Sequence, residues 1–335
     1  MQHARCSEFL ESRGSFPISV GANLSQDSGS HTNTTFPESL SLLYALLPGV
    51  YSVICAIGLT GNTAVIYVIL RAPKMKTVTN VFVLNLAIAD GLFALVLPAN
   101  IAEHLLQHWP FGETLCKLVL AIDHYNIFSS AYFLAVMSAD RYLVVLATVR
   151  SRRMPTRTRG GAKVASLCVW LGVTIMVLPF FSFAHVYSNE LQVPSCGLSF
   201  PRPEQAWLKA SRIYTLVLGF LVPMCTICVL YVDLLRRLRA MRLRSSAKAL
   251  SKAKRKVTVL VLAVLAVCLF CWAPFHLASV VSLTTDVPQT ALVIGISYAI
   301  TSLSYANSCL NPFLYAFLDD SFRKNFRTMV LCWEA

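Results

Sequence analysis

Seven long apolar stretches alternate with short polar ones along the chain. They cover residues 43–70, 81–102, 115–146, 164–184, 207–235, 257–283 and 291–318. Each holds about 20 residues or more, the length that a helix needs to cross a hydrocarbon core roughly 30 Å thick. The strands of a membrane barrel would instead alternate in segments of about ten residues. The pattern predicts an all-α membrane protein, with a seven-transmembrane helix bundle at 43–318 after an extracellular tail at 1–42.

Composition and charge set the expected orientation. Of the 335 residues, 56% are hydrophobic and 13% are charged, a more apolar balance than the roughly 45–50% of soluble domains. Of 29 Lys and Arg residues, 22 lie in the C-terminal tail or in the loops after the first, third and fifth stretches. Basic loops stay in the cytoplasm, so we expect a multi-pass plasma-membrane protein with its N-terminus outside. The net charge of +13 then reflects topology and contact with anionic membrane lipid, and no nucleic-acid partner is expected.

Features typical of exported segments fall on the predicted outside. Asn23 and Asn33 begin two N-glycosylation sequons in a tail rich in Ser, Thr and Gly. No apolar signal-peptide core precedes them, so the first stretch is expected to act as an uncleaved signal anchor. Most of the 11 cysteines lie within the stretches, but Cys116 opens the third stretch and Cys196 lies in the loop before the fifth. Because both face the oxidising side, a disulfide between them is predicted.

A carboxylate and several amides and hydroxyls lie deep in three of the stretches. Asp90 lies near the middle of the second stretch. Asn126 and Ser130, and likewise Asn307 and Asn311, are spaced i, i+4, so each pair faces one side of its helix. One carboxylate with neutral oxygens suits a sodium ion or a water network. Polar contact between helices explains the same residues equally well, and both interpretations stay open.

A second aspartate, Asp123, lies two turns inside Cys116, near the outer mouth of the bundle. No Lys or Arg in the stretches stands at an obvious matching depth, so we expect Asp123 to meet a cationic ligand group; a solvated structural acid is the alternative. The candidate ligand-binding residues around it are Asn100, Glu103, Gln107, Phe275, His276, Tyr298 and Tyr305. Acids suit an amine or a lysine, and aromatic rings suit ring side chains or a cation. For His276 a packed bundle histidine, and for Glu103 a solvated helix end, remain alternatives.

Asp140, Arg141 and Tyr142 lie at the cytoplasmic end of the third stretch. Adjacent charges on a helix can pair locally and hold Arg141 in one rotamer, while its length allows it to bind elsewhere if the inner bundle opens. This arrangement predicts a latch. Two residues that snorkel at a helix end are the alternative.

Prolines fall inside the later stretches, at Pro98, Pro179, Pro223, Pro274 and Pro312. Proline removes a backbone hydrogen bond and kinks a helix. The kinks beside Trp272 and Tyr315 are therefore expected to act as hinges.

An amphipathic helix and short tail are predicted at 319–335, after the seventh stretch. Phe322, Phe326, Met329 and Val330 are spaced i, i+4, i+7, i+8 with basic residues between them. Cys332 at the end of this segment is a candidate for palmitoylation.

Together these motifs resemble those of the rhodopsin-like G-protein-coupled receptors, with a match in every stretch in the right order. The motifs are Gly61-Asn62, "LNLAIAD", Cys116, "DRY", Trp170, Pro223 with Tyr231, "CWAP" and "NPFLY". "LRAPKMKTVTNVFVLNLAIAD" resembles the opioid and somatostatin branch. "WPFGETLCKLVLAIDHYNIFSS" and "LTTDVPQTALVI" are similar to the neuropeptide B and neuropeptide W receptors, nearer the second of their subtypes. The resemblance runs from about residue 42 to the end.

The resemblance implies a receptor that binds neuropeptides B and W outside and activates inhibitory G proteins (Gi/Go) inside, lowering cyclic AMP. It implies that the acid at Asp123 meets a ligand cation and that sodium, at the cluster around Asp90, acts as an allosteric modulator. No cofactor is required. It also implies that Cys116 pairs with Cys196 and that Trp272 moves on activation.

On the cytoplasmic side, the resemblance implies that Arg141, released from Asp140, meets the G protein while Tyr231 and Tyr315 hold the open form. Lys254 stands where some relatives carry an acid that locks this arginine. The resting state is therefore expected to depend on Asp140 alone. Arrestin is a further expected partner, although the short tail offers few Ser or Thr residues.

Rival functions lack the residues that they need. A monoamine receptor usually adds serines in the fifth stretch, where "YTLVLGFLVP" offers only Thr215, and an opsin needs a lysine that 291–318 lacks. A membrane transporter would show paired repeats, and the chain shows none. No HExxH, P-loop or nucleophile elbow is present, so we expect no enzyme. A receptor for another cationic peptide, opioid-like or somatostatin-like, is the nearest alternative.

Overall fold

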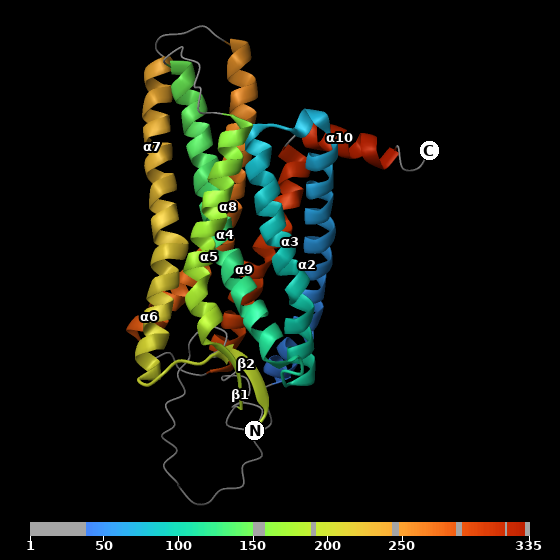
Figure 1. Cartoon of the computed structure of the whole chain (residues 1–335), viewed down its shortest axis with the longest axis vertical. Coiled ribbons are helices and arrows are strands. Elements are labelled where there is room, and N and C mark those ends of the chain that lie inside the picture. The colour runs from blue at the N-terminus through green and yellow to red at the C-terminus, as the bar shows by residue number, and fades with distance from the viewer. Residues whose placement is uncertain are drawn as a thin grey trace, which may run out of the picture.

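Long helices run side by side and make up nearly all of the structure (Figure 1). The computed structural model describes residues 38–149, 158–188, 192–242, 248–285, 290–318 and 320–331. The bundle comprises α2 (Glu38–Arg71), α3 (Val78–Leu106), α4 (Gly112–Val149), α5 (Arg159–Phe183), α6 (Glu204–Leu216), α7 (Val222–Arg242), α8 (Lys248–Thr284) and α9 (Ala291–Leu318). A short 3-10 turn, η1 (Pro73–Met75), links α2 to α3, and a π-helical turn, η2 (Val217–Leu221), joins α6 to α7 in one span.

The predicted seven spans are confirmed. Six spans of the described chain, with α6 and α7 counted as one, are long and apolar enough to cross a membrane. The seventh, α9, is 28 residues long, but its polar side chains lower its hydropathy. These side chains are all at most 4% exposed and therefore face the other helices rather than lipid: Ser297, Thr301, Ser304, Asn307, Ser308 and Asn311.

The lipid-facing surface is marked by exposed apolar side chains. On α5, Val164, Leu167, Leu171, Ile175 and Leu178 form one exposed stripe at helical spacing. Polar side chains such as Asp90, Asn126 and Asn307 instead face inward. Exposed hydroxyls such as those of Thr60 and Ser182 donate to carbonyls of their own helix.

A β-hairpin lies at one end of the bundle, and α10 (Asp320–Leu331) lies at the other, across the bundle axis (Figure 1). Its strands, β1 (Ala184–Ser188) and β2 (Pro194–Leu198), are antiparallel, with Val186 opposite Cys196. The sequence predicted α10 but no strand in this loop.

The π-helical turn was also not predicted. It lies immediately before Pro223, whose ring would clash with the carbonyl of Gly219 in a regular helix. A wider turn moves that carbonyl away. Gly219 is buried, and a Cβ there would lie 3.2 Å from Cγ2 of Ile127, so glycine also lets α4 approach this turn.

Pro312 is held by two residues of α2. Because proline has no N–H, it leaves the carbonyl of Ser308 without its helical partner. Asn62 Nδ2 donates to that carbonyl at 2.8 Å. Gly61 packs against the proline ring, since a Cβ at Gly61 would lie 3.0 Å from both Cβ and Cγ of Pro312. The Gly61-Asn62 motif thus fixes α2 against Pro312 of α9.

We predict that Gly61→Ala destabilises the folded chain by about 1–3 kcal/mol, because the added methyl overpacks the contact with Pro312. The thermal unfolding midpoint of the purified protein in detergent measures this effect. Gly49→Ala is the matched control on the same helix, because a Cβ there meets nothing within 4 Å. Equal midpoints for both variants would contradict the proposed packing.

Candidate functional site

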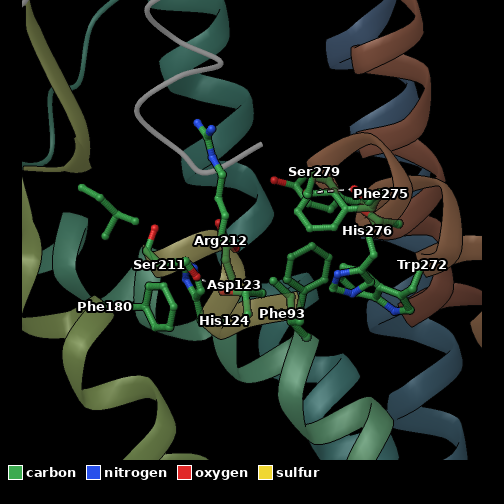
Figure 2. Close-up of a pocket in the computed structure, with 15 residues that line it drawn as sticks. Phe93, Asp123, His124, Phe180, Ser211, Arg212, Trp272, Phe275, His276 and Ser279 are labelled. Carbon is green, nitrogen blue, oxygen red and sulfur yellow. Dashed lines mark hydrogen bonds between the residues drawn. The ribbon is translucent and has the colours of Figure 1, made fainter. Parts of the chain in front are cut away.

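A cavity lies among the helices next to the β-hairpin, whose Leu198 belongs to its lining (Figure 2). Its lining comes from α3, α4, α5, β2, α6, α8 and α9, and includes Phe93, Asp123, His124, Ile127, Phe180, Leu198, Ser211, Arg212, Thr215, Trp272, Phe275, His276, Ser279, Ser304 and Tyr305. Its volume is about 50 Å³, far below the roughly 300–1,000 Å³ of pockets that hold drug-sized ligands. A ligand side chain can therefore enter only if the walls move apart.

Four of the predicted ligand-binding residues meet in this lining: Asp123, Phe275, His276 and Tyr305. His276 is buried and stacks on Phe220, with ring centroids 4.6 Å apart, so it both packs in the bundle and lines the cavity. Tyr305 packs edge-on against Phe93 at 5.0 Å. The wall of the cavity that α8 and α9 form is thus aromatic.

Arg212 is the main feature that the sequence analysis missed. Its side chain is 9% exposed and lines the same cavity as Asp123. Figure 2 shows both residues on the side of the cavity opposite Trp272 and His276. The depths of the two residues along their helices indicate that they can lie near each other. At 1.5 Å per residue, Arg212 lies about 12 Å from the start of α6 and Asp123 about 16 Å from the start of α4. The cavity therefore contains both signs of charge.

The other four predicted ligand-binding residues lie outside this lining. Glu103 is only 3% exposed, so it is not a solvated helix end, and its Oε1 accepts a hydrogen bond from the backbone N–H of Cys196 at 3.2 Å. Gln107 ends α3 in the left-handed conformation, and its Nε2 donates to the carbonyl of His104 at 2.5 Å. Tyr298 packs edge-on against His104, and Asn100 is buried.

Three connections hold β2 over this end of the bundle. The predicted disulfide between Cys116 and Cys196 is present. The N–H of Trp109 donates to the carbonyl of Pro194 at 2.8 Å. With the bond from Cys196 to Glu103, these contacts fix β2, whose Leu198 lines the cavity.

The polar cluster predicted around Asp90 forms in the centre of the bundle. Asn311 Nδ2 donates to Asp90 Oδ2 at 2.8 Å, and Ser308 Oγ donates to Asn126 Oδ1 at 3.1 Å. Ser130 donates to the same Asn126 oxygen at 3.4 Å. These side chains are almost completely buried.

Several polar atoms of this cluster could still bind an ion or a water molecule. Among the residues that the structure describes, Asp90 Oδ1, Asn311 Oδ1 and both amide atoms of Asn307 have no hydrogen-bond partner. Buried polar atoms without partners are costly in a bundle interior. An ion or ordered water that binds these oxygens would remove that cost.

The charges near the end of α4 form the predicted local pair. Arg141 forms an ion pair with Asp140, and both are buried. Thr79 of α3, which was not predicted, accepts a hydrogen bond from Arg141 and donates to Asp140 Oδ2 at 3.3 Å. Tyr142 donates to Asp233 Oδ2 on α7 at 2.6 Å. Asp140 is thus not alone in holding Arg141, and the side chain of Lys254 lies outside the described part of the chain.

Trp272 belongs both to the cavity lining and to the large apolar core that continues toward the end of the bundle that carries α10. It packs edge-on against Phe275 at 5.8 Å and lies two residues before Pro274 in α8. Tyr231 and Tyr315 belong to the same core. A shift of Trp272 would therefore change core packing between the cavity and Arg141.

The remaining predicted sites fall partly outside the described residues. In α10, Phe322 is buried and stacks on Phe326 at 6.1 Å, whereas the side chains of Met329 and Val330 are not described. Asn23, Asn33 and Cys332 also lie outside the described residues.

The sequence of this chain is similar to those of several known proteins. The sequence matches the family described as "7 transmembrane receptor (rhodopsin family)" over residues 61–315. It is 80% identical to the Homo sapiens neuropeptides B/W receptor type 2 over 333 residues, 99% of this chain and 100% of that receptor. It is 66% identical to the Rattus norvegicus neuropeptides B/W receptor type 1 over 289 residues, 86% and 88% of the two chains. With the Mus musculus somatostatin receptor type 2 it shares 40% identity over 318 residues, 95% and 85% of the two chains.

We predict that Glu103→Ala lowers the thermal unfolding midpoint, because it leaves the buried N–H of Cys196 without this acceptor, at a cost of about 1–3 kcal/mol. Glu103→Gln keeps an acceptor oxygen and should stay close to the parent. A scan of the purified protein under non-reducing conditions measures both midpoints. If Gln lowers the midpoint as much as Ala, the carboxylate charge rather than the hydrogen bond carries the role of Glu103.

Proposed function

Because the chain belongs to the rhodopsin family of seven-transmembrane receptors, we propose that it is a cell-surface receptor for neuropeptides B and W that signals through inhibitory G proteins. It is a multi-pass membrane protein of a receptor family, not an enzyme. The observation that supports the ligand class is the 80% identity to a neuropeptides B/W receptor over 99% of the chain.

In this proposal Asp123 binds a cationic group of the peptide. Arg212 lines the same cavity and places a cation beside a carboxylate there, which suits a peptide group that carries an oxygen acceptor as well as a cation. Phe275, His276 and Tyr305 supply ring faces for the aromatic side chains of the peptide.

Activation follows from the small size of the cavity. A peptide end that enters has to displace the wall formed by α8, and Trp272 with the kink at Pro274 lies at the base of that wall. Movement there repacks the core that contains Tyr231 and Tyr315. Arg141 then leaves Asp140 and Thr79 and meets the G protein. The peptide favours the open state only by binding it more tightly than the resting state.

Sodium in the resting state is part of the proposal. The donor set around Asp90 has one carboxylate and neutral oxygens from Asn126, Ser130, Asn307 and Asn311, which suits a small hard cation. The unpartnered oxygens of Asp90, Asn307 and Asn311 support an ion here. No group of three His, Cys, Asp or Glu side chains in the described ranges could hold a metal ion, so a transition-metal site is not favoured.

The remaining features complete the proposal. We place the hairpin end outside and α10 inside, with glycans on Asn23 and Asn33 and a palmitoyl chain on Cys332. Guanine-nucleotide exchange on Gi lowers cyclic AMP. Arrestin is the second proposed cytoplasmic partner.

We predict that neuropeptides B and W stimulate guanine-nucleotide exchange on Gi in membranes that contain this chain, whereas somatostatin and an opioid peptide do not. Asp123→Asn should reduce peptide potency by a hundredfold or more, because it removes a charge-assisted bond worth about 3 kcal/mol with little change in size. Surface labelling checks that the variant reaches the membrane.

Glu103→Gln is the matched control, since it removes one acidic charge outside the cavity lining. It should keep parental potency. Equal potency of Asp123→Asn and the parent would contradict the ligand contact, and a response only to somatostatin or the opioid peptide would replace the proposed ligand.

We predict that Asp90→Asn abolishes the effect of sodium on agonist affinity. In the parent, replacing choline chloride by sodium chloride should weaken agonist binding, because sodium stabilises the resting state. Asparagine keeps an acceptor for Asn311 but lacks the charge that holds the ion. Radioligand competition in the two salts measures the effect, and an unchanged sodium effect in the variant would remove the ion site.

A further inference from the structure

A hydrogen bond that plays no part in the activation steps proposed above joins α4 to α7. The hydroxyl of Tyr142 donates to Asp233 Oδ2 at 2.6 Å. Hydroxyl bonds to an ionised carboxylate are about 2.5–2.7 Å long and roughly twice as strong as bonds between neutral groups. The contact therefore has the length of a strong, charge-assisted bond.

Asp233 is an unusual residue for its position. It is the one acidic residue of α7, and four arginines follow it in that helix. It is half-buried, as is Tyr142. A carboxylate at the edge of a membrane span is costly unless it has a partner, and aspartate is among the weaker helix formers. The hydroxyl of Tyr142 supplies such a partner from another helix.

Tyr142 and the two charges before it hold α4 from two sides. Arg141 pairs with Asp140 and donates to Thr79 of α3. At about 100° per residue, Tyr142 points roughly 200° away from Asp140, and it contacts α7 instead of α3. The bond to Asp233 thus exists in the same arrangement in which Arg141 is still held.

The beginning of α7 is fixed against α4 by close packing. This helix runs from η2 toward the end of the bundle that carries α10 (Figure 1). A Cβ at Gly219 of η2 would lie 3.2 Å from Cγ2 of Ile127 on α4, so the two backbones are close there. Pro223 follows at once, and sharp bends in helices form at prolines. The start of α7 is therefore a suitable pivot.

Asp233 lies far from this pivot. It follows Gly219 by 14 residues, which is about 21 Å at 1.5 Å per residue. A tilt of α7 by about 10° around η2 moves Asp233 by about 4 Å over that length. Because a donor and an acceptor more than about 3.5 Å apart form no hydrogen bond, such a tilt separates Asp233 from Tyr142. A small tilt of α7 and this bond thus exclude each other.

We propose that Asp233 is a positioning residue that acts through Tyr142 to hold α7 against α4 and thereby favours the resting state. The inference rests on the proposed signalling through Gi, because it requires this end of the bundle to open when Arg141 is released. Loss of the bond frees α7 to tilt and shifts the population toward the open state. The identity of the peptide does not enter the argument.

Basal guanine-nucleotide exchange on Gi, measured per receptor in membranes without peptide, tests the proposal. Tyr142→Phe keeps the ring and removes the donor, and Asp233→Ala removes the acceptor. Each should raise basal exchange about tenfold, since that factor corresponds to about 1.4 kcal/mol, close to the contribution of one hydrogen bond. Asp233→Asn keeps a neutral acceptor and should lie between the parent and Asp233→Ala.

Peptide affinity provides a second readout of the same equilibrium. The affinity for neuropeptide W without Gi should rise in Tyr142→Phe, by up to about tenfold, because more of the receptor is in the binding-competent state. A variant that merely folds poorly loses both exchange and peptide binding, whereas a released receptor gains both. Lower basal exchange with weaker peptide binding in Asp233→Ala would place the bond in the open state and overturn the proposal.

A double variant and a control assign the effect to this bond. Tyr142→Phe combined with Asp233→Ala should exceed either single variant by less than about twofold, because both changes remove the same bond. Tyr67→Phe removes an exposed tyrosine hydroxyl from the last turns of α2, at the same end of the bundle, and should keep parental basal exchange. Multiplied effects in the double variant, or unchanged exchange in Tyr142→Phe, would overturn the proposal.

Hydrogen exchange separates this proposal from the proposed function, because it needs neither peptide nor G protein. In the purified chain, the amides of 228–236 should exchange faster in Tyr142→Phe than in Tyr67→Phe or the parent, since the end of α7 is no longer held. Equal exchange would overturn the role of the bond even in a receptor that signals. If the parent activates no Gi, the proposed function fails, while faster exchange in Tyr142→Phe still supports the hold on α7.

Discussion

Polar groups within the lipid-covered part of this chain must find their hydrogen-bond partners inside the protein, because hydrocarbon offers them none. This constraint decides how α2, α3, α4 and α9 are arranged. The polar face of α9 points to Asp90 and Asn126, and Asn62 satisfies the carbonyl that Pro312 leaves without a helical donor. Gly61 permits the close approach that this bond needs. The same polar contacts that hold the helices together therefore form the centre of the proposed mechanism.

The proposed receptor has three polar layers along one bundle. The outer layer is the cavity with Asp123 and Arg212, the middle layer is the cluster around Asp90, and the inner layer is Arg141 with Asp140 and Thr79. Apolar packing that includes Trp272 and Tyr315 lies between them. Because packed cores resist continuous deformation, movement at one layer is transmitted as a change between discrete arrangements rather than as a gradual strain.

Most of the architecture could be predicted from the sequence, because the length and polarity of each span are local properties. The seven spans, the disulfide, α10 and the membership of the rhodopsin family are confirmed. Features that depend on the relative depth of two helices were missed: Arg212 beside the cavity of Asp123, and Thr79 beside Arg141. The β-hairpin and the π-helical turn were missed because tertiary contacts, rather than local periodicity, stabilise them. Glu103 shows the same limit, since only the fold reveals that it accepts a bond from Cys196.

In the proposed mechanism, the outer cavity and the inner charges both change when the receptor passes from the resting to the open state. Thermodynamic linkage then requires that the G protein tighten peptide binding by the same factor by which the peptide tightens G-protein binding. The most direct measurement is the dissociation constant of neuropeptide W for this chain in lipid nanodiscs, with and without nucleotide-free Gi, together with that of Gi with and without the peptide. The account predicts two equal factors, of roughly 5–150. A peptide affinity that does not change when Gi is bound would contradict it.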